Sequence, residues 1–475
     1  MRKFWGLLIN EYVKIFSRAA TLIMLALLVL AGVGYNFIVS QEARMYTHSV
    51  EDEVWSDYDQ WIADEKTNKD EGWQLRVEQY EFERDSQIPH ETSQNYRYAA
   101  INAAFDIKAQ LQSGYLAERG VDLKAAEQLM KDFLSLSRGG DVKTFWQLKI
   151  KLLDLNVYDE TKPELDAERW RIDTILALDL DVWGEDWRAR VAEQAANVRA
   201  TLIVPEEGAK ITKETAQKIQ NQQDAIALLE YRLENNIPVC LEESRFHELM
   251  PSGAEDGSYW SALKDSTLIL IFVGLLVILV AGVSVSQEFS QGTVKFLLLQ
   301  PVKRGKIFAA KYVSILTVGL LMVALYFVVN AVSAGLFLGG FGDIGAPYLH
   351  FVDGKIVESS AFIPVIKEYL IGTVSIAVYA TLAFAVSTLL RNTALAVLIS
   401  GALLGGGTVS QDFFWSGHPD WGRYLIFFNV DLNTIARGES VFFQHTVPFA
   451  LCVIAVYLLV FLLTAWDGFT RRDVK

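Results

Sequence analysis

The residues that could make a docking contact lie in one short stretch, 287–307, between two long apolar runs. It reads QEFSQGTVKFLLLQPVKRGKI and carries four basic residues, one acid and four consecutive large apolar side chains at 296–299. Thr293 can accept hydrogen bonds from the first backbone N–H groups of a following helix. Pro301 disfavours helix at the residue before it. The pattern predicts a short helix at 294–299, about 9 Å long at 1.5 Å per residue.

A short helix of this kind at a membrane surface exposes hydrocarbon, and exposed hydrocarbon usually indicates a binding partner. A helix that dips its leucines into lipid is the alternative. It explains the leucines, but it gives no reason for the Gly-Thr break, the proline stop and the basic VKRGK to occur together. The stretch therefore predicts a site where another protein docks.

Motifs for catalysis or nucleotide binding are absent from this sequence. A phosphate-binding loop needs Ser or Thr after its Gly-Lys pair, whereas both Gly-Lys pairs, at 305–306 and 354–355, are followed by Ile. The His-Glu pairs at 90–91 and 247–248 do not complete the zinc-binding pattern H-E-x-x-H. We expect no enzyme activity, no catalytic residue, no metal site and no cofactor on this chain.

The elements that must position the docking stretch are apolar segments long enough, or nearly so, to cross a membrane. A crossing helix needs about 20 apolar residues, and the predicted spans contain no charged residue or histidine. They lie at 19–39, 267–286, 312–338, 369–390, 394–410 and 447–465. A soluble core would instead show helices with a charged face. The expected fold is an all-α membrane protein with six transmembrane helices.

Lys and Arg indicate the orientation, because they are enriched in short cytoplasmic loops. Thirteen of them fall on one side of the six predicted spans, and the short loops on the other side carry only Lys355, Lys367, Arg423 and Arg437. This distribution predicts a multi-pass protein of the plasma membrane with both termini in the cytoplasm. The docking stretch then also lies in the cytoplasm, with a helix predicted at about 290–300.

The sequence between the first two spans is expected to form a large extracellular domain at about 40–266. Residues 41–265 hold 45 of the 57 acidic and 26 of the 43 basic residues, a net charge of −19. So acidic a domain is not expected to bind nucleic acid and would attract cations; the alternative is that the charge serves solubility alone. Apolar periodicity at 96–120, 122–140 and 212–236 predicts long helices, the first closed by Gly120.

Two further segments are expected to lie at the membrane surface. Residues 1–18 form an amphipathic helix when wound at 100° per residue, with Glu11 and Lys14 on the polar half. Such a helix lies in the interface, with its bases toward head groups. Residues 411–446 mix aromatic and polar side chains, which suits short interfacial or re-entrant helices before the last span.

The docking stretch, extended to Tyr312, resembles the segment between the second and third spans of ABC-2 type transporter permeases. In that family a Glu, a Gly-Thr pair, a leucine-rich run, a Pro-Val pair, an Arg and a later Lys recur. The amphipathic N-terminal helix, the six-span layout and the semi-apolar segment before the last span are also similar. Here the matching positions, with Phe296 beside the leucines, are Glu288, Gly292, Thr293, Leu297, Leu298, Leu299, Pro301, Val302, Arg304 and Lys311.

The resemblance implies a coupling helix that docks in a separate ATPase subunit, which would hold ATP and Mg²⁺. The chain would then be the permease of an ATP-driven exporter, paired with a second copy or a related permease in the bilayer. The large insert between the first two spans departs from the compact members of the family. This insert leaves the identity of the substrate open. The acidic domain leads us to expect an amphipathic or cationic antimicrobial compound, drug or peptide.

Polar residues within the predicted spans are candidates for lining a path for that substrate. Each of them could equally hydrogen-bond neighbouring helices together. They are Asn330, Ser333, Thr373, Ser375 and Tyr379.

Two other functional classes remain open from the sequence. One is a signalling or mechanical device, in which ATP-driven movement of the spans acts through the extracellular domain without transport. The other is a receptor anchored by six spans that has no ATPase partner.

Overall fold

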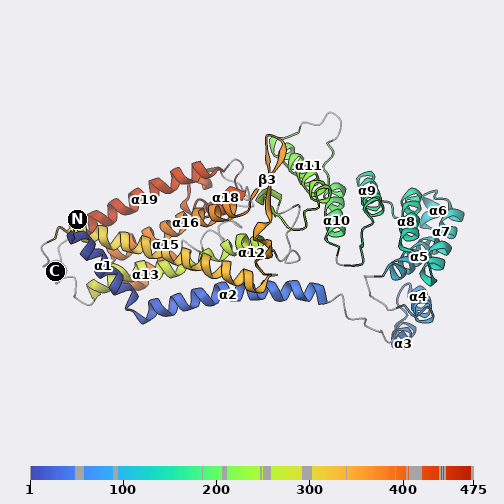
Figure 1. Cartoon of the computed structure of the whole chain (residues 1–475), viewed down its shortest axis with the longest axis horizontal. Helices are drawn as coiled ribbons and strands as arrows, with labels where there is room; N and C mark the ends of the chain where they lie inside the picture. Colours follow the sequence, from blue (N-terminus) through green and yellow to red (C-terminus); the bar gives the residue numbers. More distant parts are fainter. Residues whose placement is uncertain are drawn as a thin grey trace.

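The computed structural model of this chain is elongated, with a bundle of long helices at one end and a domain of shorter helices at the other (Figure 1). Both chain termini lie at the far end of the bundle, which we call the terminal end; the opposite end of the bundle is the domain end. The structure describes residues 2–48, 58–88, 95–184, 186–205, 211–246, 249, 258–290, 302–338, 340–390, 392–402, 405, 420–437, 440, 442 and 445–471.

The bundle contains the helices that are long and apolar enough to cross a membrane. Among the described residues there are five such helices. Val273, Tyr326 and Phe384 are buried between them, while Leu30, Leu336 and Leu459 are exposed on the outside. An exposed apolar surface of this extent suits a lipid environment. The five helices are α2 (Ala19–His48), α13 (Leu270–Ser290), α15 (Arg304–Phe337), α16 (Phe362–Leu390) and α19 (Val447–Thr470).

Five of the six predicted spans therefore coincide with long helices. The sixth prediction, 394–410, falls on a helix described only over Thr393–Ala402, which is too short to cross a membrane by itself. Most of its remaining residues lie outside the described part of the chain. Within the described residues, five helices are therefore candidates for membrane spans.

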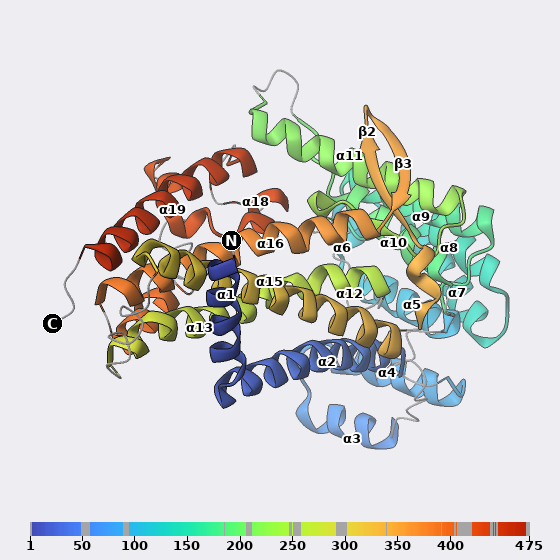
Figure 2. The same cartoon turned by 60° about the vertical axis from the view of Figure 1, so that its left-hand side comes forward.

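The N-terminal helix α1 (Arg2–Phe16) crosses the bundle at the terminal end and packs against α15 (Figure 2). Leu8 and Ile15 are buried, whereas Trp5, Ile9 and Val13 are about 60% exposed. The helix thus has two apolar faces, one against the bundle and one directed outward. The outward face suits the acyl region at the membrane surface.

The separate domain is a stack of helices with its own apolar core, which includes Phe133, Phe145, Ile172 and Leu228. The helices predicted at 122–140 and 212–236 are confirmed, with Asp122 and Thr212 accepting hydrogen bonds from the first-turn N–H groups. The helices are α3 (Tyr58–Asn68), α4 (Trp73–Asp85), α5 (Tyr96–Ser113), α6 (Tyr115–Glu118), α7 (Leu123–Arg138), α8 (Val142–Leu155), α9 (Lys162–Leu178), α10 (Trp187–Ala200) and α11 (Lys213–Glu234).

The helix predicted at 96–120 is interrupted. The chain turns at Gly114, whose φ of 77° is left-handed, and the single turn α6 follows before Gly120. Glycine reaches this conformation without a steric penalty, so Gly114 ends α5.

The predicted class, an all-α membrane protein, is confirmed, and a small three-stranded sheet that was not predicted joins the domain to the bundle. Strand β1 (Leu241–Glu242) pairs in parallel with β2 (Pro347–Val352), which pairs antiparallel with β3 (Lys355–Ser360). The hairpin turns at Asp353 and Gly354, with φ of 51° and 74°. Asp-Gly is a strong signal for this two-residue turn, so the sequence did contain the information.

Short helices complete the domain end. After β1 come η1 (Ser244–Phe246), α12 (Tyr259–Asp265) and η3 (Ser266–Ile269), and η4 (Phe341–Gly345) precedes β2. The described part of the predicted interfacial segment 411–446 forms η5 (Asp420–Tyr424), η6 (Ile426–Phe428) and α18 (Leu432–Arg437). Helix α18 packs against α16 and α19. A re-entrant position of this segment in a membrane stays a prediction.

Candidate functional site

Four charged side chains from three helices meet at the terminal end of the bundle; we call them the terminal cluster. The Lys311 ammonium lies 2.9 Å from a Glu11 carboxylate oxygen and 2.8 Å from a Glu288 oxygen. The Lys14 ammonium lies 3.1 Å from Glu11 and 2.9 Å from Glu288. The cluster therefore ties α1 to α13 and to α15.

Lys311 is the centre of the cluster, with only 1% of its side chain exposed. Its third hydrogen bond goes to the Ser284 carbonyl oxygen at 3.3 Å, so all three ammonium donors are used. A buried cation is tolerated when it is paired and fully hydrogen-bonded. Removing one partner of a buried ion pair costs about 3–5 kcal/mol. This arrangement therefore requires all three helices to stay together.

Lys14 lies at the edge of the cluster. Burial lowers its pKa, but the hydrogen bonds and charges of Glu288 and Glu11 outweigh that effect and hold the pKa above its ordinary value. Since the folded-state pKa is raised, the stabilisation is complete at neutral pH. It is lost only as the pH rises through the raised pKa, above the ordinary value of 10.5.

The terminal cluster corrects one expectation from the sequence. Glu11 was expected on the polar half of α1, which faces head groups. It is instead buried, on the same face of the helix as Leu8 and Ile15. A helical wheel shows which residues share a face and does not show what that face contacts. Lys311 lies 300 positions away in the chain, and its need for a counter-charge is met only in the folded bundle.

The predicted docking stretch begins and ends beside the terminal cluster. Glu288 lies near the end of α13, and Arg304 begins α15 and donates to the Thr470 carbonyl oxygen of α19 at 3.2 Å. The other predicted coupling residues Gly292, Thr293, Phe296, Leu297, Leu298, Leu299 and Pro301 lie outside the described residues.

Two of the predicted path-lining residues contact a neighbouring helix. The Asn36 amide of α2 donates to the Asn330 side-chain oxygen at 3.1 Å and to the Ser333 hydroxyl at 2.7 Å. All three side chains are buried. In a single chain they hydrogen-bond α2 to α15, which is the packing alternative that the sequence left open.

The other three lie on α16. The Thr373 hydroxyl donates to the Tyr369 carbonyl oxygen one turn earlier at 2.9 Å, and the Ser375 hydroxyl donates to the Val430 carbonyl oxygen. Tyr379 is buried in the bundle core. A role for the five residues in lining a path between two chains stays a prediction.

Gly32 allows the close approach of α2 and α15. A Cβ atom at this position would lie 2.9 Å from a Val329 methyl group. We expect Gly32→Leu to lower the free energy of unfolding by about 1–3 kcal/mol, the usual cost of overpacking. Thermal unfolding in detergent measures this, with Gly34→Leu as the control because a Cβ there meets nothing within 4 Å. Equal melting temperatures for the two variants would contradict the prediction.

A second set of charged residues, the junction cluster, lies at the domain end. The Arg437 guanidinium of α18 lies 2.9 Å from a Glu368 carboxylate oxygen of α16 and 3.1 Å from the Thr267 hydroxyl of η3. Both charged side chains are largely buried. The cluster ties the segment before α19 to two other parts of the bundle.

Charged contacts continue from the bundle into the domain. Lys264 of α12 donates to the Glu242 carbonyl oxygen at 3.2 Å, and the Arg232 guanidinium of α11 lies 2.9 Å from the Glu242 carboxylate. Arg232 also donates to the Pro238 carbonyl oxygen at 3.1 Å. Together with the β1–β2 pairing, these contacts join α11 to the spans.

The apolar bundle, its exposed outer surface and the charged clusters at both ends define a multi-pass α-helical membrane protein. The chain belongs to the family described as "Protein of unknown function (DUF2705)", whose model matches residues 227–475. The match begins inside α11 and includes the sheet, α12 and all the long spans except α2. Most of the helical domain therefore lies outside the part that defines the family.

Two relatives come from Bacillus subtilis (strain 168). The uncharacterized protein YhcI is 33% identical over 291 residues, which are 61% of this chain and 84% of YhcI. The uncharacterized membrane protein YdbK is 27% identical over 225 residues, which are 47% of this chain and 87% of YdbK. No solved structure gives a significant match.

Proposed function

We propose that this chain is the permease of an ATP-driven exporter of the ABC-2 type, energised by a separate ATPase subunit. ATP and Mg²⁺ would bind to that subunit, and this chain would carry no catalytic residue. The terminal end of the bundle would face the cytoplasm and the helical domain would lie outside the cell. The excess of Lys and Arg in the loops of the terminal end supports this orientation.

The observation that carries the proposal is the position of the terminal cluster. It fixes the end of α13, the first turns of α15 and the interfacial helix α1 to one another beside the docking stretch. A partner that pulls on residues 291–301 would then move two spans and α1 together. Because buried ion pairs cannot separate without a large cost, little of that movement would be absorbed locally.

Transport through this fold would need a second subunit. The five long helices and the short apolar helix of the described residues would form half of the translocation path expected for an exporter of this kind. A homodimer is the simplest assembly, because closed two-fold symmetry is the commonest in oligomers. The net charge of −19 on residues 41–265 favours a cationic or amphipathic substrate, such as an antimicrobial peptide or drug.

Purification of the tagged protein in mild detergent from its native membranes tests the proposal. We expect a subunit with a phosphate-binding loop to co-purify, and the eluate to hydrolyse ATP. Leu298→Pro should abolish co-purification while leaving the protein in the membrane, because proline breaks the predicted coupling helix. A control proline at Leu123, the first residue of α7, is tolerated at a helix start.

Purified protein that lacks any such subunit in several detergents would contradict the proposal and favour an anchored receptor. Undiminished co-purification of the Leu298→Pro protein would place the docking contact elsewhere on the chain.

A second candidate function is mechanical or signalling output through the domain. The contacts that favour it are the β1–β2 pairing and the Arg232–Glu242 ion pair, which connect α11 to the spans. Reconstituted vesicles distinguish the two functions. ATP-dependent accumulation of a cationic peptide supports export, whereas ATP hydrolysis with a changed protease sensitivity of the domain and no accumulation supports signalling.

A further inference from the structure

A cavity of about 260 Å³ lies between α8 and α9 in the helical domain. Its apolar wall is formed by Val142, Ile175, Leu176 and Leu180, together with the ring of Trp146. The volume is below the roughly 300–1,000 Å³ of sites that enclose whole drug-sized ligands. It suits one apolar side chain of a larger molecule.

Trp146 supplies a hydrogen-bond donor that the described structure leaves unused. The residue is 3% exposed, and its Nε1–H has no hydrogen-bond partner among the residues that the structure describes. Its ring is held by stacking on Trp183, with ring centres 5.3 Å apart. A buried donor without an acceptor is unfavourable, so a carbonyl oxygen delivered by a ligand would relieve the cost.

Two carboxylates lie at the rim of the same cavity. Asp141 accepts a hydrogen bond from the Thr144 backbone N–H at 2.7 Å, and hydrogen bonds from Thr144 hold the pKa of Asp141 below its usual value. Asp179 lies 3.4 Å from the Lys143 ammonium, and both of these side chains are largely exposed. Two carboxylates with one ammonium leave the rim negative, which favours a basic group on the ligand.

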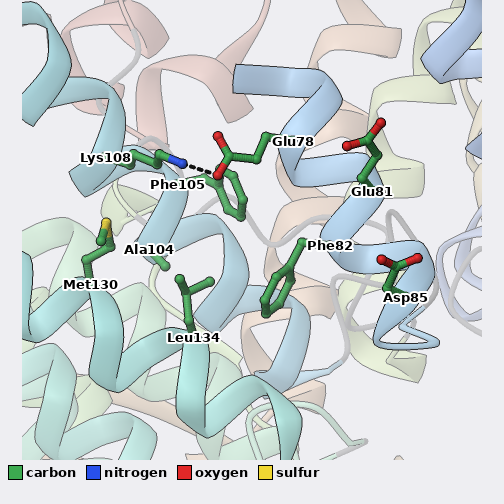
Figure 3. Close-up of a pocket in the computed structure, with 9 residues that line it drawn as sticks. All are labelled: Glu78, Glu81, Phe82, Asp85, Ala104, Phe105, Lys108, Met130 and Leu134. Carbon is green, nitrogen blue, oxygen red and sulfur yellow. Dashed lines mark hydrogen bonds and ion pairs between the residues drawn. The ribbon is translucent and has the colours of Figure 1, made fainter. Parts of the chain in front are cut away.

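Another cavity in the domain lacks this combination. It has a volume of about 240 Å³ and is lined by Phe82, Phe105 and Leu134, with several acidic residues (Figure 3). Its Glu78 pairs with Lys108, as Figure 3 shows, and Glu81 lies 3.2 Å from Lys66. None of its lining residues has a buried polar atom without a partner in the described structure. This cavity serves as the control.

We propose that the cavity between α8 and α9 binds a peptide in which an apolar residue adjoins a basic one. The apolar side chain would fill the cavity, a backbone carbonyl oxygen would accept from Trp146 Nε1–H, and the basic side chain would contact Asp141 and Asp179. The role of this peptide as cargo or signal rests on the proposed function, whereas its binding does not. The residues that line this cavity and its rim would then determine which ligand the helical domain binds.

Binding of a fluorescein-labelled peptide of alternating leucine and lysine tests the site. The full chain is reconstituted in phosphatidylcholine nanodiscs without nucleotide or ATPase, and empty nanodiscs give the baseline for lipid binding. We expect Trp146→Phe to weaken binding about fivefold, the effect of one lost hydrogen bond. The double variant Asp141→Asn with Asp179→Asn should weaken it by at least as much, and the effect should shrink at high salt.

These substitutions preserve the local backbone. Asn is as good an N-cap as Asp at position 141, and it tolerates the left-handed conformation of Asp179, where φ is 50°. Leu176→Trp fills the cavity from a partly exposed position and should also block binding. The double variant Glu81→Gln with Asp85→Asn removes the same charge beside the control cavity and should bind as the wild type does.

Equal binding by all the variants would overturn the proposal. Displacement of the peptide by dodecyltrimethylammonium that is as effective in Trp146→Phe as in the wild type would also overturn it. This amphiphile has no carbonyl group, so such a result would identify a site for cationic lipids. Failure here is distinguishable from failure of the exporter function, because the binding assay needs no ATPase and the co-purification does not depend on this cavity.

Discussion

Lys311→Met is expected to lower the free energy of unfolding by about 3 kcal/mol, because it removes the cation between two buried carboxylates. Glu11 and Glu288 would remain close together, with Lys14 3.1 Å and 2.9 Å away as a partial replacement. That replacement is why the expected cost lies at the lower end of the range for a broken buried pair. Thermal unfolding of the purified protein in detergent measures the change.

The matched control for Lys311→Met removes the charges together. In the triple variant Glu11→Gln, Glu288→Gln and Lys311→Met the volumes are nearly kept, no carboxylate remains in the terminal cluster, and Lys14 stays at its partly exposed edge. Replacing a whole buried ion cluster by neutral groups of similar shape is often neutral or stabilising. We expect the triple variant to unfold at a higher temperature than Lys311→Met alone, and the reverse order would contradict a role for charge pairing.

The same variants separate stability from coupling. If α1, α13 and α15 transmit movement as one unit, the triple variant would regain stability but lose the tight link between them. ATP hydrolysis by the proposed complex would then continue while transport declines. Equal transport by the triple variant and the wild type would leave the terminal cluster with a purely structural role.

Arg437→Met is expected to have the second largest effect, again about 3 kcal/mol, because it removes the guanidinium that lies 2.9 Å from Glu368. The loss should appear at the domain end, where α18 packs against α16 and α19. Thermal unfolding gives the overall cost, and limited proteolysis of the segment before α19 shows where it arises.

The control for Arg437→Met is the double variant Glu368→Gln with Arg437→Met, which removes both charges. It should regain part of the stability, and the coupling energy between the two substitutions measures the pair. Arg437→Met should leave co-purification of the proposed ATPase intact, since the junction cluster lies at the opposite end of the bundle from the docking stretch. Loss of the ATPase in this variant would contradict that separation of roles.

Several parts of the fold could be predicted from local sequence. The long apolar runs determined the five helices of the described residues that are long enough to span a membrane, because each backbone polar group must be satisfied within the segment in lipid. Caps at Asp122 and Thr212 determined where α7 and α11 begin. The hairpin could also have been predicted, because Asp353-Gly354 is a strong signal for its two-residue turn.

Tertiary structure alone decided the partners of the polar side chains. The sequence does not show what Asn330 and Ser333 contact, and their hydrogen bonds with Asn36, about 300 positions away, exist only in the folded chain. The Trp146 N–H, which has no hydrogen-bond partner among the described residues, likewise becomes a feature only where α8 and α9 line a cavity together. Periodicity and capping act within a few residues of the chain, so the sequence by itself determined the helices. The pairing of buried charges depends on which helix faces meet, so only the folded bundle decided that Lys311 joins Glu11 to Glu288.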